Sequence, residues 1–250
     1  MSDWSSSAQY LRNEARHYDD EIGAGWPTGP AVRFLRDVVG AGSRVLEFGV
    51  GTGRIALPLG SGSGLSVTGV DNSADMLAVL GTKDPAGVIR TRHADMVDVR
   101  LDERFDLVYC VFNTIYALPD QDTQVAFLRN AARHLADDGR LVLETQMIGL
   151  SDFVNNKIIA PTQIRPDRTE LVMILHDPAE QTLVRQTVNF RADGVHLAPL
   201  RMRYVWPAEL DLMARLAGLR RTGRFGGWSR EPFTGTGVCI SIYQHGSDLQ

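Results

Sequence analysis

A glycine-rich turn at residues 47–54 carries the clearest chemical signal in the sequence. Three glycines stand at alternate positions, Gly49, Gly51 and Gly53, after a short apolar run and the acid Glu47. Glycine lets the backbone adopt a positive φ and approach a ligand closely. A strand that passes through such a turn into a helix is how doubly wound sheets hold a nucleoside. The segment therefore predicts a nucleoside site at the end of a first strand, residues 44–46.

The side chains around the glycines indicate which nucleoside this is. A dinucleotide-binding turn requires its third glycine at the position that Arg54 occupies here. Glu47 would repel phosphates, whereas it suits a cationic ligand that carries an ammonium and a sulfonium group. On these residues the segment resembles the first motif of the class I S-adenosylmethionine-dependent methyltransferases. The alternative for the motif alone is an ordinary glycine-rich turn.

A second acid follows at the spacing that nucleoside sites require. Asp71 ends a β-branched strand, residues 66–70, and stands 24 residues after Glu47. An acid at about this spacing accepts the ribose hydroxyls in βαβ units. Asn72 and Met76, at the start of the next helix, are also counted with the cofactor-binding residues. The alternative for Asp71 is a helix cap.

Two later strands end in further candidates. Asp95 ends a third strand that begins at residue 88, and the resemblance implies that it accepts from the adenine amino group while Met96 packs on the ring. Asn113 and Tyr116 follow a fourth strand, residues 105–112, near the expected position of methyl transfer. Ligands of open α/β sheets lie beyond the carboxyl ends of the strands. Capping and loop hydrogen bonds are the alternative for both residues.

Three side chains are candidates for catalysis, and one pair is a candidate cover. His17, His176 and Tyr116 are counted as catalytic candidates. A general base is needed only if an alcohol or phenol must lose a proton, and His17, His134 and His176 could supply it. His134, at the end of a helix, is expected to be structural. Tyr18, followed by Asp19, resembles the aromatic–acid pair that folds over the cofactor in many small-molecule methyltransferases. Surface or turn positions are the alternative for the histidines, and an ordinary helix end is the alternative for Tyr18.

The order of the elements, together with the resemblance, implies an α/β fold. We expect a Rossmann-like doubly wound sheet of seven strands, the last one antiparallel, with an antiparallel β cap insertion. Residues 1–43 would form an N-terminal flap and first helix, and 44–146 the S-adenosylmethionine-binding core. Residues 147–206 would form the substrate cap, and 207–250 a C-terminal helix and the strands that complete the core sheet.

Several boundaries are sharper predictions. A helix is expected over 120–136 and is stopped by Asp137, Asp138 and Gly139, with a fifth strand over 140–144. Residues 147–156 are expected as a loop or short helix. The cap strands are expected at 169–176, 182–190 and 195–206 because apolar and polar residues alternate there.

Composition excludes several classes of protein. The net charge of the 250 residues is −4, which argues against a general nucleic-acid-binding protein. We find no apolar run of transmembrane length, no signal peptide and no zinc-ligand spacing, and both cysteines fall in apolar strands. We therefore expect a cytoplasmic protein without membrane, nucleic-acid or metal partners, and we also consider a homodimer.

These observations predict an enzyme that moves a methyl group from S-adenosylmethionine to an O, N or C nucleophile of a small molecule. The resemblance to bacterial small-molecule methyltransferases places it in secondary metabolism, such as antibiotic biosynthesis. The alternative is a protein of the same fold that binds the cofactor but catalyses a non-methylating reaction such as a cyclisation. A nicotinamide-dependent oxidoreductase is disfavoured by Glu47 and Arg54.

Overall fold

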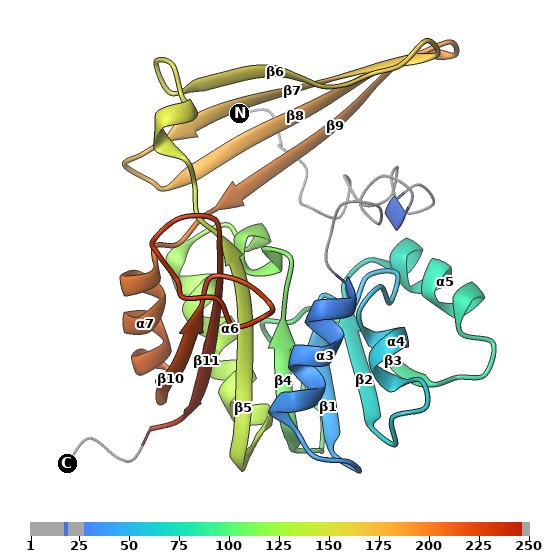
Figure 1. Cartoon of the computed structure of the whole chain (residues 1–250), viewed down its shortest axis with the longest axis vertical. Helices are drawn as coiled ribbons and strands as arrows, with labels where there is room; N and C mark the ends of the chain where they lie inside the picture. Colours follow the sequence, from blue (N-terminus) through green and yellow to red (C-terminus); the bar gives the residue numbers. More distant parts are fainter. Residues whose placement is uncertain (1–17, 20–27, 247–250) are drawn as a thin grey trace.

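Two separate β-sheets, one above the other, organise the protein (Figure 1). A computed structural model describes residues 18–19 and 28–246. The lower sheet has seven strands in the order β10-β11-β5-β4-β1-β2-β3. These strands are β1 (Arg44–Phe48), β2 (Ser66–Asp71), β3 (Ile89–His93), β4 (Phe105–Cys110), β5 (Leu135–Gln146), β10 (Leu219–Phe225) and β11 (Val238–His245).

The strand directions confirm the predicted doubly wound sheet. Strands β1 to β5 pair in parallel, and β11 runs antiparallel to both of its neighbours, β5 and β10. The chain winds outward from β1 through β2 to β3 and then returns to place β4 on the other side of β1. The strand order therefore reverses between β1 and β4, which is where open α/β sheets bind their ligands.

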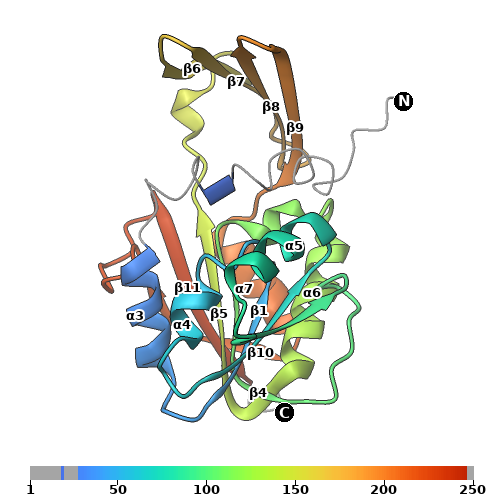
Figure 2. The same ribbon diagram turned by 90° about the vertical axis from the view of Figure 1, so that its right-hand side faces the viewer.

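Helices cover both faces of the core sheet (Figure 2). Strand side chains alternate between faces, so Val45 packs with α3 (Thr28–Val38) and α4 (Ala56–Gly60). Leu46 packs on the other side with α6 (Gln121–His134) and α7 (Pro207–Leu216). The helix α5 (Ala74–Lys83) contributes Leu80 to the α3 side. None of the described helices is both long enough and apolar enough to span a bilayer.

The end of α6 differs from the prediction. The helix ends at His134, and the next residue, Leu135, is already extended and buried against the core as the first residue of β5. The expected stop signal at 137–139 lies inside β5 at an irregular pairing with β4. A Cβ on Gly139 would lie 2.8 Å from the Phe105 carbonyl oxygen, so this glycine allows close strand contact rather than ending the helix.

The upper sheet is the predicted antiparallel cap, and it has four strands in sequential order. They are β6 (Lys157–Ile164), β7 (Arg168–Asp177), β8 (Thr182–Arg191) and β9 (Gly194–Arg203), with the short 3₁₀ turn η2 (Leu150–Asp152) before them. The sequence did not predict β6, because Ile158 and Ile159 break the alternation and Pro161 disfavours a strand interior. Strand β9 ends three residues before the predicted boundary. The division of the chain at residues 146 and 206 stays a proposal.

The cap is placed above the carboxyl ends of the parallel strands. The chain leaves the end of β5 upward into the cap and returns from β9 to α7 (Figure 1). Leu183 of the cap belongs to the core cluster on the α6 side, which joins the two sheets at this end. The cap therefore faces the sheet edge where the ligand is expected.

Candidate cofactor and acceptor site

The glycine turn is built from three left-handed residues with different surroundings. Gly49, Gly51 and Gly53 have φ values of 75°, 52° and 78°. A Cβ on Gly49 would lie 2.4 Å from Thr114, and one on Gly53 would lie 2.3 Å from Leu80. A Cβ on Gly51 would meet no atom within 4 Å. Gly49 and Gly53 are thus required for packing, whereas Gly51 exposes backbone to open space, as a ligand-binding turn requires.

Asp71 lies beside this open glycine. Its side chain is 8% exposed, and its two carboxylate oxygens accept from the backbone N–H groups of Gly51 and Ser73, each at 2.8 Å. Burial raises the pKa of Asp71, and the two backbone hydrogen bonds act in the opposite direction. A carboxylate oxygen can accept more than one hydrogen bond. Asp71 is therefore held rigidly and retains the capacity to accept two hydroxyl groups.

Glu47 forms a buried acid beneath the turn. It is 2% exposed, and its Oε2 accepts from the Tyr109 hydroxyl at 2.8 Å. Burial raises the pKa of Glu47 to about 8, although the Tyr109 hydrogen bond and the charge of Arg54 lower it. Sequence reasoning missed Tyr109, which pairs with Glu47 across β1 and β4. Only the strand register brings the two together, since 62 positions separate them in the chain.

The pair Tyr18 and Asp19 lies at the glycine turn, and its role as a cover for the cofactor stays a prediction. Asp19 accepts from the Thr52 hydroxyl at 2.7 Å and forms an ion pair with Lys83 at 2.8 Å. The Tyr18 ring packs edge-on against Phe112 with centroids 6.4 Å apart. These contacts tie the segment ahead of the first strand to the turn and to the end of β4. His17, the neighbouring candidate base, lies outside the described residues.

Two adjacent residues just after β4 have a left-handed backbone. Phe112 and Asn113 have φ values of 59° and 58°, which cost energy in residues other than glycine and cluster at functional sites. The Phe112 N–H donates to Glu144 at 2.8 Å, and the Asn113 amide oxygen accepts from the Gln146 N–H at 2.6 Å. The Arg54 guanidinium lies 5.3 Å from the Phe112 ring centre. Two residues of β5 therefore hold Phe112 and Asn113 in place, and Arg54 of the glycine turn packs on the Phe112 ring.

The other predicted cofactor residues are placed around the same edge. Asp95 is exposed, and its side chain accepts from the Val97 N–H at 2.8 Å, while Met96 packs partly against the core. Asn72 is exposed at the end of β2. Met76 is 1% exposed, so its side chain is packed inside the protein. Their contacts with adenine stay predictions.

Two candidate catalytic residues lie where the core meets the cap. Tyr116 is 2% exposed, its hydroxyl donates to the Gln146 carbonyl at 3.1 Å, and burial raises its pKa. His176 Nε2 lies 3.0 Å from the Tyr204 hydroxyl, and its ring lies 4.8 Å from that of Phe153. These contacts favour a packing role, and catalysis by either residue stays a prediction.

The histidine expected to be structural has structural contacts. His134 is buried, with Nδ1 2.8 Å from the Asn130 carbonyl oxygen and Nε2 accepting from the Leu101 N–H at 3.1 Å. Burial lowers the pKa of His134, so it is held neutral.

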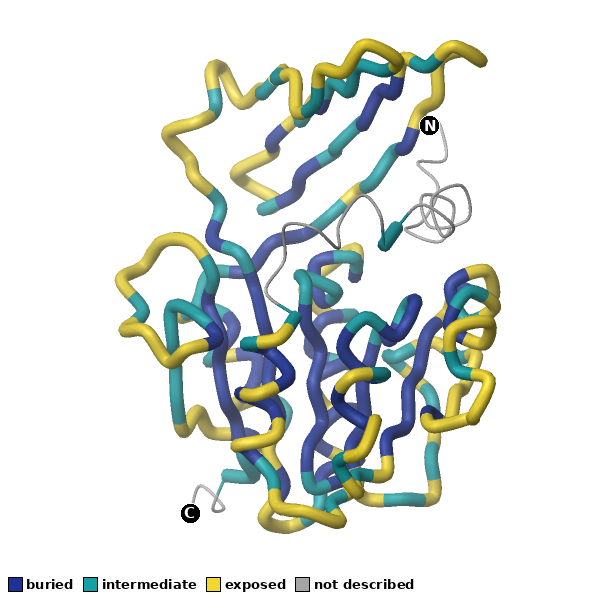
Figure 3. Tube along the Cα trace, turned by 45° about the vertical axis from the view of Figure 1, so that its right-hand side comes forward, coloured by how far each residue is buried: buried dark blue, intermediate teal, exposed yellow. Residues whose placement is uncertain are grey.

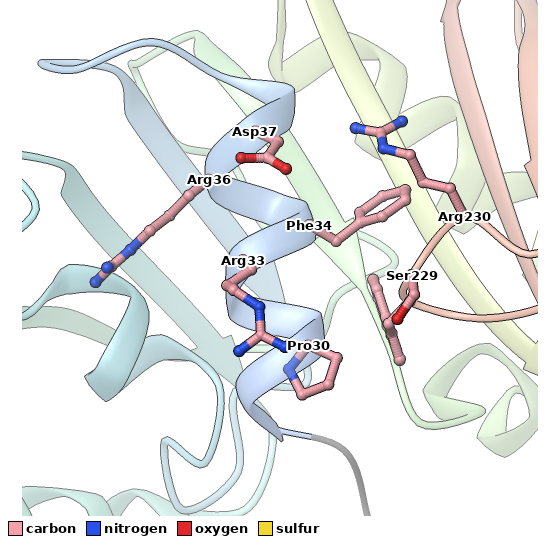
Figure 4. Close-up of a pocket in the computed structure, with 8 residues that line it drawn as sticks. Pro30, Arg33, Phe34, Arg36, Asp37, Ser229 and Arg230 are labelled. Carbon is pink, nitrogen blue, oxygen red and sulfur yellow. The ribbon is translucent and has the colours of Figure 1, made fainter.

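An open hollow of about 350 Å³ lies outside this site, between α3 and the loop that follows β10 (Figure 4). Two of the arginines that line it, Arg36 and Arg230, are engaged by neighbouring groups. Arg36 donates to the Pro58 carbonyl, and the Arg230 guanidinium lies 4.7 Å from the Phe34 ring centre. Trp228 borders the hollow and donates to Glu144 at 3.1 Å. The loop beside the hollow is therefore tied to the residues that follow β4 through Trp228 and Glu144.

Comparisons with known proteins identify the family. Residues 45–139 match the family model described as a methyltransferase domain. The chain is 30% identical over 196 residues to the cypemycin N-terminal methyltransferase of a Streptomyces species, covering 77% of this chain and 79% of that protein. It is 31% identical over 150 residues to a dTDP-3-amino-3,6-dideoxy-α-D-glucopyranose N,N-dimethyltransferase of Streptomyces fradiae, covering 60% and 57%.

A solved structure agrees over nearly the whole chain. The CcbJ methyltransferase from Streptomyces caelestis superposes with a TM-score of 0.89 at 29% identity, covering 97% of this chain and 100% of that one. The protein therefore belongs to the class I S-adenosylmethionine-dependent methyltransferases, and S-adenosylmethionine is its cofactor.

The residues present fit this cofactor. Asp71 offers two carboxylate oxygens beside the open face of Gly51, which suits the hydroxyls of a ribose, and Glu47 is a buried acid at the same turn, which suits a sulfonium or ammonium group. When bound, S-adenosylmethionine supplies an electrophilic methyl carbon.

Proposed function

We propose that the protein methylates an amine nitrogen of a small molecule in bacterial secondary metabolism. The observation that carries the proposal is that the described candidate bases are engaged elsewhere. Tyr116 donates to a backbone carbonyl, and the described nitrogen contact of His176 is with Tyr204. An alcohol or phenol must lose a proton to become a good nucleophile, whereas a neutral amine already has a free lone pair. The names of two relatives, both N-methyltransferases of Streptomyces, support the same assignment.

In this proposal the chain binds and aligns rather than removes a proton. Asp71 holds the ribose, Gly51 provides close backbone contact, and Glu47 balances positive charge from below. Tyr18 and Asp19 cover the turn from the other side. Alignment of two reactants within about 3–3.5 Å can contribute much of the rate of a bimolecular reaction. The low exposure of the two acids strengthens each charge interaction because water is excluded.

We place the acceptor under the cap. On β8 the residues Leu183, Thr187 and Asn189 share one face, and Leu183 packs into the core, so this is the inner face of the cap. Thr187 and Asn189 are 5% and 1% exposed, and their side-chain oxygens have no partner among the described residues. A buried polar atom without a partner costs about 1–3 kcal/mol. These oxygens therefore suit an acceptor that carries hydroxyl or amino donors.

A labelling experiment tests the proposed function. The protein is incubated with S-adenosylmethionine carrying a ¹³C-methyl group and with pairs of acceptors, each an amino compound and its hydroxyl counterpart on the same scaffold. Amino sugars and peptides with a free N-terminus form the first panel. We expect label on nitrogen in at least one amino compound and none in its hydroxyl partner, with Asp71→Ala as the control.

Two outcomes would contradict the proposal. Label on oxygen or carbon would keep the enzyme a methyltransferase but reject the amine. Conversion of an acceptor with all label left on the cofactor would favour the non-methylating alternative. Mass spectrometry of the products distinguishes the two.

A further inference from the structure

The outer face of the cap sheet is apolar and exposed. Met173 and Leu175 of β7 and Phe190 of β8 belong to the two central strands of the cap. The strand register places them on the face opposite to Leu183 and Asn189. Edge-strand residues share it through the same register. We name this set the outer cap face: Ile159, Met173, Leu175, Phe190, Val195 and Leu197, which are 37% to 70% exposed. Exposed apolar patches of several hundred Å² mark interaction sites.

The sheet edges carry features that prevent strand addition. β6 and β9 are the edge strands, and each contains a proline, Pro161 and Pro199. The pairing of β6 with β7 also shifts between Pro161 and Gln163. Proline and bulges on edge strands are devices against edge-to-edge pairing. The edges are thus protected while the face is left apolar, which indicates association by stacking of faces.

The charge pattern of the face favours a second copy of the chain as the partner. Residues that pair across the four strands form rows on this face, and four such rows lie between Lys157 and Ile164. In these rows the only charged residues are Lys157 and Arg201, and both belong to the row at one end. A partner bound through ion pairs would need charges spread over the face. An identical apolar face meets the requirement. A two-fold axis that lies in the interface and runs across the strands places the two cationic rows at opposite ends, where they avoid each other.

The size of the face agrees with such a dimer. Strands about 4.8 Å apart that rise about 3.3 Å per residue give four strands of this length an area of roughly 600 Å². Two copies would then bury about 1,200 Å², the lower end of the range for specific interfaces. We propose that the outer cap face stacks on the same face of a second copy of this chain, leaving the inner face to the acceptor.

The oligomeric state of the full chain tests this inference. Sedimentation velocity at micromolar concentration should give a dimer for the unchanged protein. Met173→Glu places two like charges at the centre of the interface and should raise the dissociation constant about a hundredfold or more. The matched control is Leu216→Glu, because Leu216 is a comparably apolar residue, 58% exposed, on α7 and away from the cap. The control should stay dimeric.

Cross-linking locates the interface without a disruptive charge. The two native cysteines, Cys110 and Cys239, are buried. A bismaleimide should therefore join Met173→Cys protomers into a covalent dimer and leave Leu216→Cys protomers single. A monomeric unchanged protein, a Met173→Glu variant that stays dimeric, or equal cross-linking of both cysteine variants would overturn the proposal. Binding of S-adenosylmethionine by Met173→Glu, measured by calorimetry, shows that this variant is folded.

Discussion

The core sheet and the cap sheet use their side chains in opposite ways. The central core strands are buried on both faces, whereas exposed positions recur along the cap strands (Figure 3). In the core, function sits at the strand ends, where Gly51 and Asp71 present backbone and carboxylate groups. In the cap, we place the acceptor and the contact with a second copy on the two faces of the strands. Substitutions at the strand ends of the core should therefore change cofactor binding, and those in the cap should change acceptor binding or assembly.

The largest expected effect follows from a side chain at the open glycine. Gly51→Val should weaken S-adenosylmethionine binding at least about a thousandfold, because the new side chain fills the space of the ligand. Its strain at a φ of 52° should lower the melting temperature, but less than a clash with packed side chains does. Gly53→Val is the matched control. Its side chain would clash with Leu80 and Leu57, so it should lower the melting temperature strongly. Calorimetric titration and thermal unfolding separate the two effects, and tight binding by Gly51→Val would contradict the site.

Loss of the ribose carboxylate should have the next largest effect. Asp71→Ala removes two charge-assisted hydrogen bonds to the ribose, worth on the order of 3 kcal/mol, and should weaken cofactor affinity about a hundredfold. The cofactor affinity of Asp71→Asn should lie between those of the unchanged protein and Asp71→Ala. Asp75→Ala, in the first turn of α5, is the control and should bind normally. An unchanged dissociation constant in folded Asp71→Ala would reject the assignment.

Glu47 should make the cofactor-free protein sensitive to pH. Because its pKa is about 8 when folded and ordinarily 4.5, its stabilising contribution is complete below pH 4.5 and is lost as the pH rises through 8. We expect the free energy of unfolding to fall by roughly 4–5 kcal/mol between pH 4.5 and pH 8, because each pKa unit between the folded and unfolded values corresponds to about 1.4 kcal/mol. Glu47→Gln should abolish this fall, and Glu103→Gln, at an exposed site, should not.

Urea denaturation at pH values between 5 and 9 measures the Glu47 effect. Cofactor affinity should change in the other direction. Ionised Glu47 attracts a cationic ligand, so binding should strengthen as the pH rises toward 9 and should be flat in Glu47→Gln. Parallel pH profiles of the unchanged protein and Glu47→Gln would contradict the role of this acid.

The inner cap face should affect the acceptor alone. Asn189→Ala should raise the KM for the acceptor about tenfold by removing one hydrogen bond, and leave cofactor affinity unchanged. Gln186→Ala is the control, because Gln186 lies on the opposite face of the same strand. Steady-state kinetics with the acceptor found by labelling provides the measurement. Equal increases in KM for both variants would contradict the assignment of the acceptor to the inner face.

The smallest expected effect is at His176. If His176 only fills space where the core meets the cap and does not remove a proton, His176→Ala should change kcat by less than about threefold. It should still lower the melting temperature, because its ring fills space between Phe153 and Tyr204. A loss of more than about a hundredfold in kcat, with a changed pH profile, would restore His176 as the base.

Much of the core could be predicted because its signals are local. Apolar runs, the glycine turn and the acids at strand ends lie within short segments, and the resemblance that these segments carry implied the seven-stranded sheet. Strand β6 could not be predicted, because its place depends on pairing with β7 rather than on its own pattern. The predicted end of α6 was wrong, because Gly139 is needed for the close approach of β4 rather than as a helix stop.

By itself, the sequence predicted the fold class and the cofactor, because the glycine turn and the acids at the strand ends are short motifs that carry the family resemblance. The roles of Glu47 and Asp71 follow from the same motifs and stay predictions. Only the tertiary structure decided which groups meet across long separations. It paired Tyr109 with Glu47 and brought Thr52 and Lys83 to Asp19. It showed that Tyr116 and His176 are hydrogen-bonded where the core meets the cap. It also showed that one face of the cap is apolar and exposed. Strand register and burial are properties of the whole fold, and no local pattern encodes them.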